Sequence, residues 1–323
     1  MVFETKRGLV GITFVDNIFR MAEVQVVGGQ YQINKIVQNK MNSPFDIIKH
    51  KDNQRVDDLS GIINQAVKSN NVTLERTAFS LDSQMVLMKK VPIDFGLSKV
   101  DIKEQVNWEA RQFILESINE YIIDFNQLTG EHKKGYQEIL VIAVRKAIID
   151  FILKIFSQTN LKIEVIDVNI FSAIRAIRAN YECRHGEKIA LVDISNDKIM
   201  LCFLIGGEYF LSNEFRFFDE SDEKKGAFPT DEELTKLISK EIRRLILDHK
   251  LGENIEDLDR VFLYGEMVKD EVLETLQNYY DVRIDKVNPF RRLRFASDVS
   301  VDEAIWARPE TFVVSIGSTL RQH

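Results

Sequence analysis

Residues 10–24, VGITFVDNIFRMAEV, combine a turn signal with side chains that could contact a phosphate or a metal ion. Two runs of large apolar and β-branched residues flank Asp16 and Asn17, so the segment predicts a β-hairpin with an Asp-Asn turn. A hairpin that holds a magnesium-bound phosphate needs a carboxylate near the ion and a flexible turn. The first strand carries the uncharged Thr13, so the segment raises the question of whether a nucleotide binds there.

The composition narrows the possible classes of protein. The chain has 323 residues with 45% hydrophobic content, which is enough for two domains or more. Its net charge of −7 and pI near 5.5 argue against nucleic acid as the main partner. Cys183 and Cys202 lie beside or within apolar segments and are expected to be reduced, buried thiols of a cytoplasmic protein. The five histidines are scattered, so no zinc site is expected.

The sequence predicts no direct insertion into a membrane. No segment approaches the roughly 20 apolar residues that span a bilayer, so any membrane attachment is expected to come from a partner. Residues 219–233, DESDEKKGAFPTDEE, are charged and interrupted by Gly and Pro, which indicates an exposed connection.

The predicted elements occur twice in comparable order. The opening hairpin and a third strand after Gly28-Gly29 form a meander, which a helix over 56–69 and a strand follow. A second meander with a Gly206-Gly207 turn is likewise followed by a helix over 231–250 and a strand. This duplication of architecture predicts two similar α/β lobes that face a cleft. In the first half, residues 77–165 add a strand, helix, strand, strand and helix.

Four stretches resemble, in order and at compatible spacing, the PilM family of type IV pilus assembly proteins within the actin, sugar-kinase and heat-shock-chaperone superfamily. They are residues 106–128, 138–173, 191–215, and 259–276 with VNPF near 288. FtsA-like and type II secretion GspL-like proteins are the main alternatives to the PilM family. The resemblance implies an α/β fold of duplicated actin-like (ribonuclease H-like) lobes with an inserted α+β subdomain in the first lobe.

The resemblance also implies a division into domains. The first lobe would comprise residues 1–76 and 166–186, and a C-terminal helix at about 311–323 would pack on it. The inserted PilM/FtsA-type subdomain would comprise 77–165. The second lobe would comprise 187–310, with a shorter helical insertion than the family carries.

In this superfamily the first hairpin supplies a magnesium carboxylate and a glycine turn for phosphate. The family pattern Gly-Ile-Asp-Ile-Gly is replaced by Gly11-Ile12-Thr13-Phe14-Val15, followed by Asp16 and Asn17. Asp16 lies three residues beyond Thr13, on the other face of the strand, and is interpreted as a turn residue. Arg20 stands where the family has Lys, although an exposed strand arginine is an equal alternative.

The other two nucleotide-binding segments depart from the family as well. Asp193 is present in the second hairpin, but Ser195 replaces the glycine and Asn196 follows. On the purine side Gly265 is retained, and Glu266 replaces the second glycine, where it suits the N-terminus of a helix better than a nucleotide. These departures favour a degenerate cleft, with no cofactor expected and ATP with magnesium disfavoured.

The resemblance therefore predicts a scaffold of a pilus or secretion machine, peripheral at the inner membrane and without ATP hydrolysis. Its partner would be the cytoplasmic tail of a PilN-like membrane protein, bound in a groove formed by residues 77–92 and 161–172. Trp108 is interpreted either as a core residue or as an anchor for a partner. The alternative is an active actin-like protein that binds ATP and magnesium through Asp16 and Asp193 and polymerises or cycles. Self-association into a ring is compatible with either.

Overall fold

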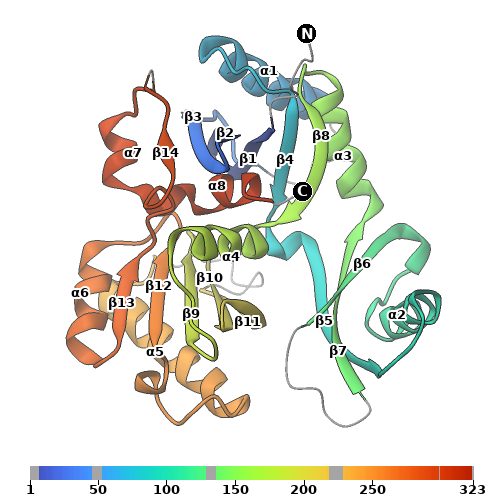
Figure 1. The fold of residues 1–323 in the computed structure, drawn as a ribbon, viewed down its shortest axis with the longest axis vertical. Helices are drawn as coiled ribbons and strands as arrows, with labels where there is room; N and C mark the ends of the chain where they lie inside the picture. Colours follow the sequence, from blue (N-terminus) through green and yellow to red (C-terminus); the bar gives the residue numbers. More distant parts are fainter. Residues whose placement is uncertain (1–6, 46–52, 129–135, 218–227, 298, 322–323) are drawn as a thin grey trace.

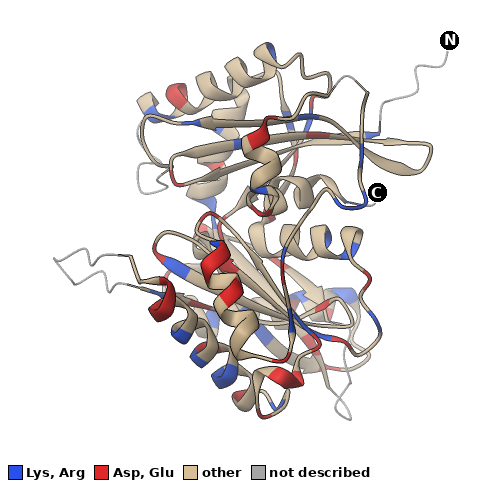
Figure 2. Cartoon of the chain, turned by 90° about the vertical axis from the view of Figure 1, so that its left-hand side faces the viewer, with Lys and Arg blue, Asp and Glu red and all other residues tan. Residues whose placement is uncertain are grey.

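The computed structural model describes residues 7–45, 53–128, 136–217, 228–297 and 299–321. Within these residues the strands form a six-stranded, a five-stranded and a three-stranded sheet (Figure 1). The first two sheets form the two lobes, which lie one above the other in the view of Figure 2. On that face basic and acidic residues are mixed rather than gathered by sign. The fold is the duplicated-lobe α/β fold that the sequence predicts.

The first lobe is built on the predicted opening meander. Its strand order is β14-β3-β2-β1-β4-β8. The strands are β1 Gly8–Val15, β2 Ile18–Val27, β3 Gln30–Lys40, β4 Arg76–Leu81, β8 Lys162–Val168 and β14 Arg294–Phe295. Val15 pairs with Ile18, so Asp16 and Asn17 form the turn as predicted, and Asp16 takes a φ of 50°. A short polar residue tolerates that left-handed conformation better than the β-branched Val15 would.

Helices cover both faces of this sheet. Alternate residues of β1 point to opposite faces, so Ile12 contributes to the core beneath α1 (Asn53–Ser69) and α3 (Lys146–Ser157), as does Phe151 of α3. Gly11 faces the other side, where α8 (Val313–Thr319) lies against α4 (Asn169–Asn180). The C-terminal helix α8 thus packs on the first lobe, although the second lobe precedes it in the sequence.

The three-stranded sheet is inserted between β4 and α3. Its order is β5-β7-β6, with β5 Val86–Asp94, β6 Tyr121–Gln127 and β7 Tyr136–Arg145. Helix α2 (Lys99–Phe113) packs its Ile102 and Val106 against one face of the sheet. β4 and β8 pair with each other in the first lobe's sheet, so this unit is narrower than the predicted range 77–165. The division of the remaining chain into domains stays a prediction.

The second lobe repeats the plan of the first. Its strand order is β11-β10-β9-β12-β13. The strands are β9 Lys188–Ile194, β10 Lys198–Ile205, β11 Glu208–Arg216, β12 Arg260–Tyr264 and β13 Arg283–Lys286, and the helices of this part are α5 Asp231–Asp248 and α6 Asp270–Tyr279. The short helix α7 (Glu303–Ala307) packs its Ile305 on the first lobe's sheet instead. A capping box between Thr230 and Glu233 starts α5. Most of the predicted connection 219–233 lies outside the described residues.

Two glycines allow α8 to lie against its neighbours. A Cβ on Gly317 would stand 1.8 Å from the carbonyl oxygen of Ser172 in α4, and a Cβ on Gly11 would stand 2.1 Å from the carbonyl oxygen of Ser315. Both distances are far below van der Waals contact, so any side chain would push the helix away. These glycines therefore have packing roles, and Gly11 is not directed at the cleft.

We expect Gly317→Val to lower the free energy of unfolding by about 2 kcal/mol or more, because overpacking separates α8 from α4. Gly61→Ala in α1 is the control, since a Cβ there meets nothing within 4 Å. That variant should gain roughly 0.5–1 kcal/mol. Urea denaturation measures both, and equal stability of the two variants would contradict the packing role.

Candidate functional site

The predicted nucleotide residues lie around the place where the two lobes meet. A cavity of about 40 Å³ remains there, and Thr13, Asp193, Ser195, Gly265 and Glu266 are among its lining residues. Pockets that hold drug-sized ligands measure roughly 300–1,000 Å³. The cavity is therefore far smaller than a nucleotide. Of the other candidates, Asn17 lies in the hairpin turn, where its carbonyl oxygen accepts a hydrogen bond from the Met41 N–H.

Arg20 of β2 and Glu266 form a buried, two-pronged ion pair between the lobes. Arg20 is only 1% exposed, and its Nη2 donates to Oε2 of Glu266 at 2.8 Å while Nη1 contacts Oε1. Its Nε donates to Oε1 of Gln38 at 2.7 Å, and the guanidinium lies over the Phe312 ring, 5.3 Å from its centroid. The alternative of an exposed strand arginine is thus wrong.

The sequence suggested that Glu266 suits the N-terminus of a helix, but in the structure Glu266 does not cap one. Helix α6 begins only at Asp270, so Glu266 lies in the segment before it. Its side chain instead satisfies the guanidinium of Arg20, and its carbonyl oxygen accepts a hydrogen bond of 2.7 Å from Nη2 of Arg308. A charged side chain therefore lines the cavity between the lobes and is tied to the opposite lobe.

The two hairpin turns also touch across the cleft. The side-chain amide of Asn196 in the second hairpin donates to Oδ2 of Asp16 in the first. In a phosphate-binding cleft these turns would face the ligand. In this structure Asp16 serves as an acceptor for the other turn, which goes beyond the turn role predicted for it.

Asp193 lies at the end of β9 and is buried beside the cavity. Burial raises the pKa of its carboxyl from 3.8 to about 7, and the positive charge of Lys198 opposes that rise. Ser195 Oγ is 3.5 Å from its Oδ1, a weak hydrogen bond at most. Gly265 takes a φ of 107°, and a Cβ on it would stand 2.3 Å from the same oxygen. The carboxyl group of Asp193 therefore leaves no room for a side chain at position 265.

Lys198 and Asp82 form a further bridge between the lobes that the sequence analysis missed. Lys198 Nζ lies 2.6 Å from Oδ1 of Asp82 and 3.0 Å from Oε2 of Glu214. The available signal was weak: Lys198 opens the apolar strand KIMLCFLI, and Asp82 follows a parallel strand at its carboxyl end. Among the described side chains, no group of three or more His, Cys, Asp or Glu residues is placed to hold a metal ion.

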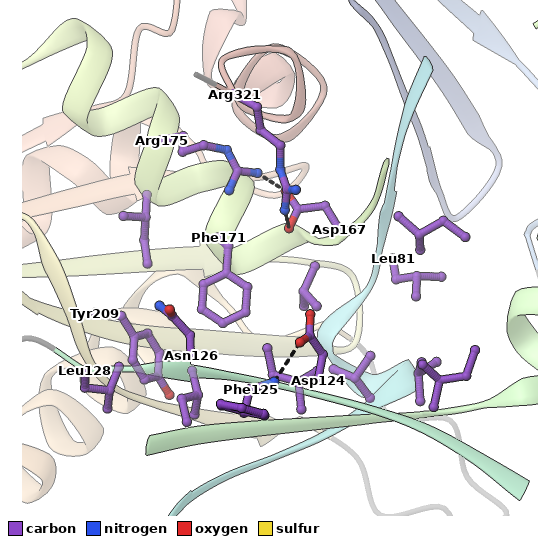
Figure 3. A pocket seen from close by; sticks show the side chains of 18 of the residues that line it. Leu81, Asp124, Phe125, Asn126, Leu128, Asp167, Phe171, Arg175, Tyr209 and Arg321 are labelled. Atoms are coloured by element: carbon purple, nitrogen blue, oxygen red, sulfur yellow. Dashed lines mark hydrogen bonds and ion pairs between the residues drawn. The ribbon is translucent and has the colours of Figure 1, made fainter. Parts of the chain in front are cut away.

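A second and much larger site lies between the inserted sheet and the first lobe. It is a groove of about 850 Å³, and Figure 3 shows its side chains. Leu140, Ile142 and Val144 of β7 line one wall, and Ile166 of β8 and Phe171 of α4 are among the residues of the other. The groove includes parts of both predicted segments, 77–92 and 161–172. It also includes β6 and α4 residues that the sequence did not indicate.

Charged side chains gather on the first-lobe side of the groove. Asp167 contacts the guanidinium of Arg175, and Nη2 of Arg321 lies 3.5 Å from Oδ1 of Asp167 (Figure 3). Burial, together with the nearby positive charge of Arg321, lowers the pKa of Arg175 to about 10. Arg175 of α4 lines this groove.

Trp108 belongs to neither site. Its side chain is 60% exposed on α2, so the core interpretation is wrong. Among the described helices, none combines the length and the apolarity that crossing a bilayer would take.

Comparisons with known proteins decide the family. The sequence pattern of the family described as type IV pilus assembly protein PilM matches residues 11–218, more than half of the chain. The chain belongs to the PilM family. A solved structure described as a PilM-PilN type IV pilus biogenesis complex superposes with a TM-score of 0.76 at 17% identity, covering 96% of each chain. A Bacteroides thetaiotaomicron protein with an actin-like ATPase fold and unknown function gives 0.50 at 14% identity, covering 90% of this chain and 95% of the other.

We expect Arg20→Met to lower the free energy of unfolding by roughly 3–5 kcal/mol, because it leaves the Glu266 carboxylate buried without its partner. The double variant Arg20→Met/Glu266→Leu should recover most of this loss, since it removes both charges. Urea denaturation of the wild type, the single variants and the double variant gives the coupling energy. Additive losses would show that the two side chains act independently.

The raised pKa of Asp193 predicts a pH dependence of stability. The folded protein binds this proton more tightly than the unfolded chain, so the stabilising contribution is present at low pH and is lost as pH rises from about 4 toward 7. Asp193→Asn should therefore gain stability relative to the wild type between pH 5 and pH 8, the range over which unfolding is measured. A difference that does not change with pH would refute this assignment.

Proposed function

We propose that this protein is a scaffold of a type IV pilus or related secretion machine, and that its groove binds the cytoplasmic tail of a PilN-like inner-membrane protein. Membership of the PilM family and the likeness to a PilM-PilN complex support this role. The observation that carries it is the groove of about 850 Å³ with apolar walls. Binding of the tail would hold the protein peripherally at the inner membrane.

The geometry of the groove suits an extended peptide. β6 is at the edge of the three-stranded sheet and β8 is at the edge of the first lobe's sheet, and residues of both line the groove. Edge strands carry backbone N–H and C=O groups that an added strand can pair with. Apolar side chains of such a peptide would pack on Ile142 and Phe171, and its polar groups could meet Asp167 and the guanidinium groups beside it.

We propose in addition that the cleft between the lobes neither binds nor hydrolyses ATP. The cavity of about 40 Å³ supports this, as does the Arg20–Glu266 pair at the purine side. Thr13 offers no carboxylate to magnesium, and the carboxyl group of Asp193 is desolvated and close to Gly265. The residues present therefore do not fit a magnesium-bound triphosphate.

The groove is tested with a synthetic peptide of the tail of a PilN-like protein encoded beside this gene. Ile122→Arg places a charge in the groove, whereas Leu115→Arg places it outside; the two residues are 43% and 99% exposed. We expect Ile122→Arg to weaken binding by about tenfold or more, and Leu115→Arg to leave it unchanged. Isothermal titration calorimetry measures the affinities. Failure of the wild type to bind, or equal binding by Ile122→Arg, would overturn the assignment.

The nucleotide proposal is tested by thermal melting with ATP and magnesium. A ligand that binds only the folded state raises the melting temperature. Because we propose that the cleft does not bind ATP, we expect no rise at millimolar ATP. Binding at micromolar ATP that Asp193→Ala abolishes would establish the alternative, an active ATP-dependent actin-like protein.

A further inference from the structure

The short connector between β4 and β5, residues 81–86, is shared by the cleft and the groove. Leu81 and Val86 at its two ends line the groove, and Leu81 stands at one side of it in Figure 3. Asp82, between them, lines the cavity between the lobes instead. This connector is also where the chain leaves the first lobe's sheet for the inserted one. It is one of two covalent connections of the inserted sheet, because β7 runs directly into α3.

Asp82 is held from two directions by one oxygen atom. Its Oδ1 accepts a hydrogen bond of 2.9 Å from the N–H of Gln84, within the connector. The same oxygen accepts from Nζ of Lys198 at 2.6 Å, which comes from β10 of the second lobe. The first contact shapes the connector, and the second attaches it to the other lobe.

Lys198 is well suited to act as this attachment. It is only 3% exposed, and Oε2 of Glu214 on the adjacent strand β11 accepts from its ammonium group at 3.0 Å. Burial lowers the pKa of Lys198, but the carboxylates of Asp82 and Glu214 outweigh burial and raise it overall, so the ammonium stays charged. Without this charge, the partly buried carboxylates of Asp82 and Glu214 would lose the cation that they share.

Other contacts join the second lobe to the same region. Nη2 of Arg216 donates to Oε1 of Gln84 in the connector at 3.2 Å, and Nζ of Lys90 on β5 lies 4.7 Å from the ring centroid of Phe210. These contacts are more exposed or weaker than the Lys198 bridge. The second lobe therefore holds both the connector and the first strand of the inserted sheet.

We propose that Lys198 is a positioning residue for the groove: by holding Asp82, it fixes the inserted subdomain relative to both lobes without a nucleotide between them. In this arrangement the side chain of Lys198 connects the second lobe to the connector, so the position of the second lobe affects the width of the groove. The biological meaning of the inference rests on the proposed function, since the groove is the proposed peptide site. The positioning itself can be measured without any ligand.

The test is a distance measurement by pulsed electron spin resonance on the full chain. Spin labels at Gly61→Cys in α1 and Lys103→Cys in α2 report the separation of the first lobe and the inserted subdomain, in a Cys183→Ser background. We expect one narrow distribution in the parent protein. Asp82→Asn, which keeps an oxygen for the Gln84 N–H but loses the charge, should broaden and shift it, as should Lys198→Met.

Two controls separate this role from general loss of stability. Asp270→Asn breaks a more exposed aspartate–lysine pair of the same 2.6 Å length, with Lys286 inside the second lobe, and should leave the distribution unchanged. Lys198→Arg, which keeps the charge, should restore a distribution closer to the parent than Lys198→Met does. An unchanged distribution in Asp82→Asn, or an equal change in Asp270→Asn, would overturn the inference.

Peptide binding separates this inference from the proposed function. If the tail peptide binds the parent protein, Asp82→Asn should weaken it by about tenfold, although Asp82 does not line the groove. Weaker peptide binding together with a broadened distribution supports the positioning role. A broadened distribution in a protein that never binds the peptide would retain the positioning role and reject the groove as the tail site. Normal peptide binding by Asp82→Asn would reject the positioning role alone.

Discussion

The ion pair between Arg20 and Glu266 constrains how the two lobes can stand. A guanidinium that is 1% exposed cannot remain unpaired, because desolvation of a charge without a partner costs several kcal/mol. Its partner comes from a segment 246 residues further along the chain, in the other lobe. The lobes must therefore meet at this point, and the space between them shrinks to a cavity of about 40 Å³.

The contact between the lobes brings together the cleft and the connector of the inserted subdomain, which are distant in sequence. The same meeting of lobes brings Lys198 to Asp82, and Asp82 belongs to the connector of the inserted subdomain. In the positioning role that we propose for Lys198, the groove depends on polar contacts made at the cleft, although its own walls are mainly apolar.

Family membership and cleft chemistry depend on different properties of the sequence. The likeness to a solved PilM-PilN complex extends over 96% of the chain at 17% identity. Such a fold needs central strands that are apolar on both faces and small residues such as Gly317 at helix crossings, and many sequences meet these needs. A triphosphate site depends on a few side chains, and we propose that Thr13 and Glu266, which line the cavity, make it unfit for one while the fold persists.

The sequence alone was sufficient for the local elements. The hairpin at 10–24 and the duplicated order of strands and helices follow from hydrophobic spacing and turn residues a few positions apart. Burial of Arg20, its pairing with Glu266 and the bridge of Lys198 to Asp82 were decided only by the tertiary structure. The spacing of a charged residue along one strand does not show which distant carboxylate will face it. For the same reason the exposure of Trp108 became clear only when α2 was placed on its sheet.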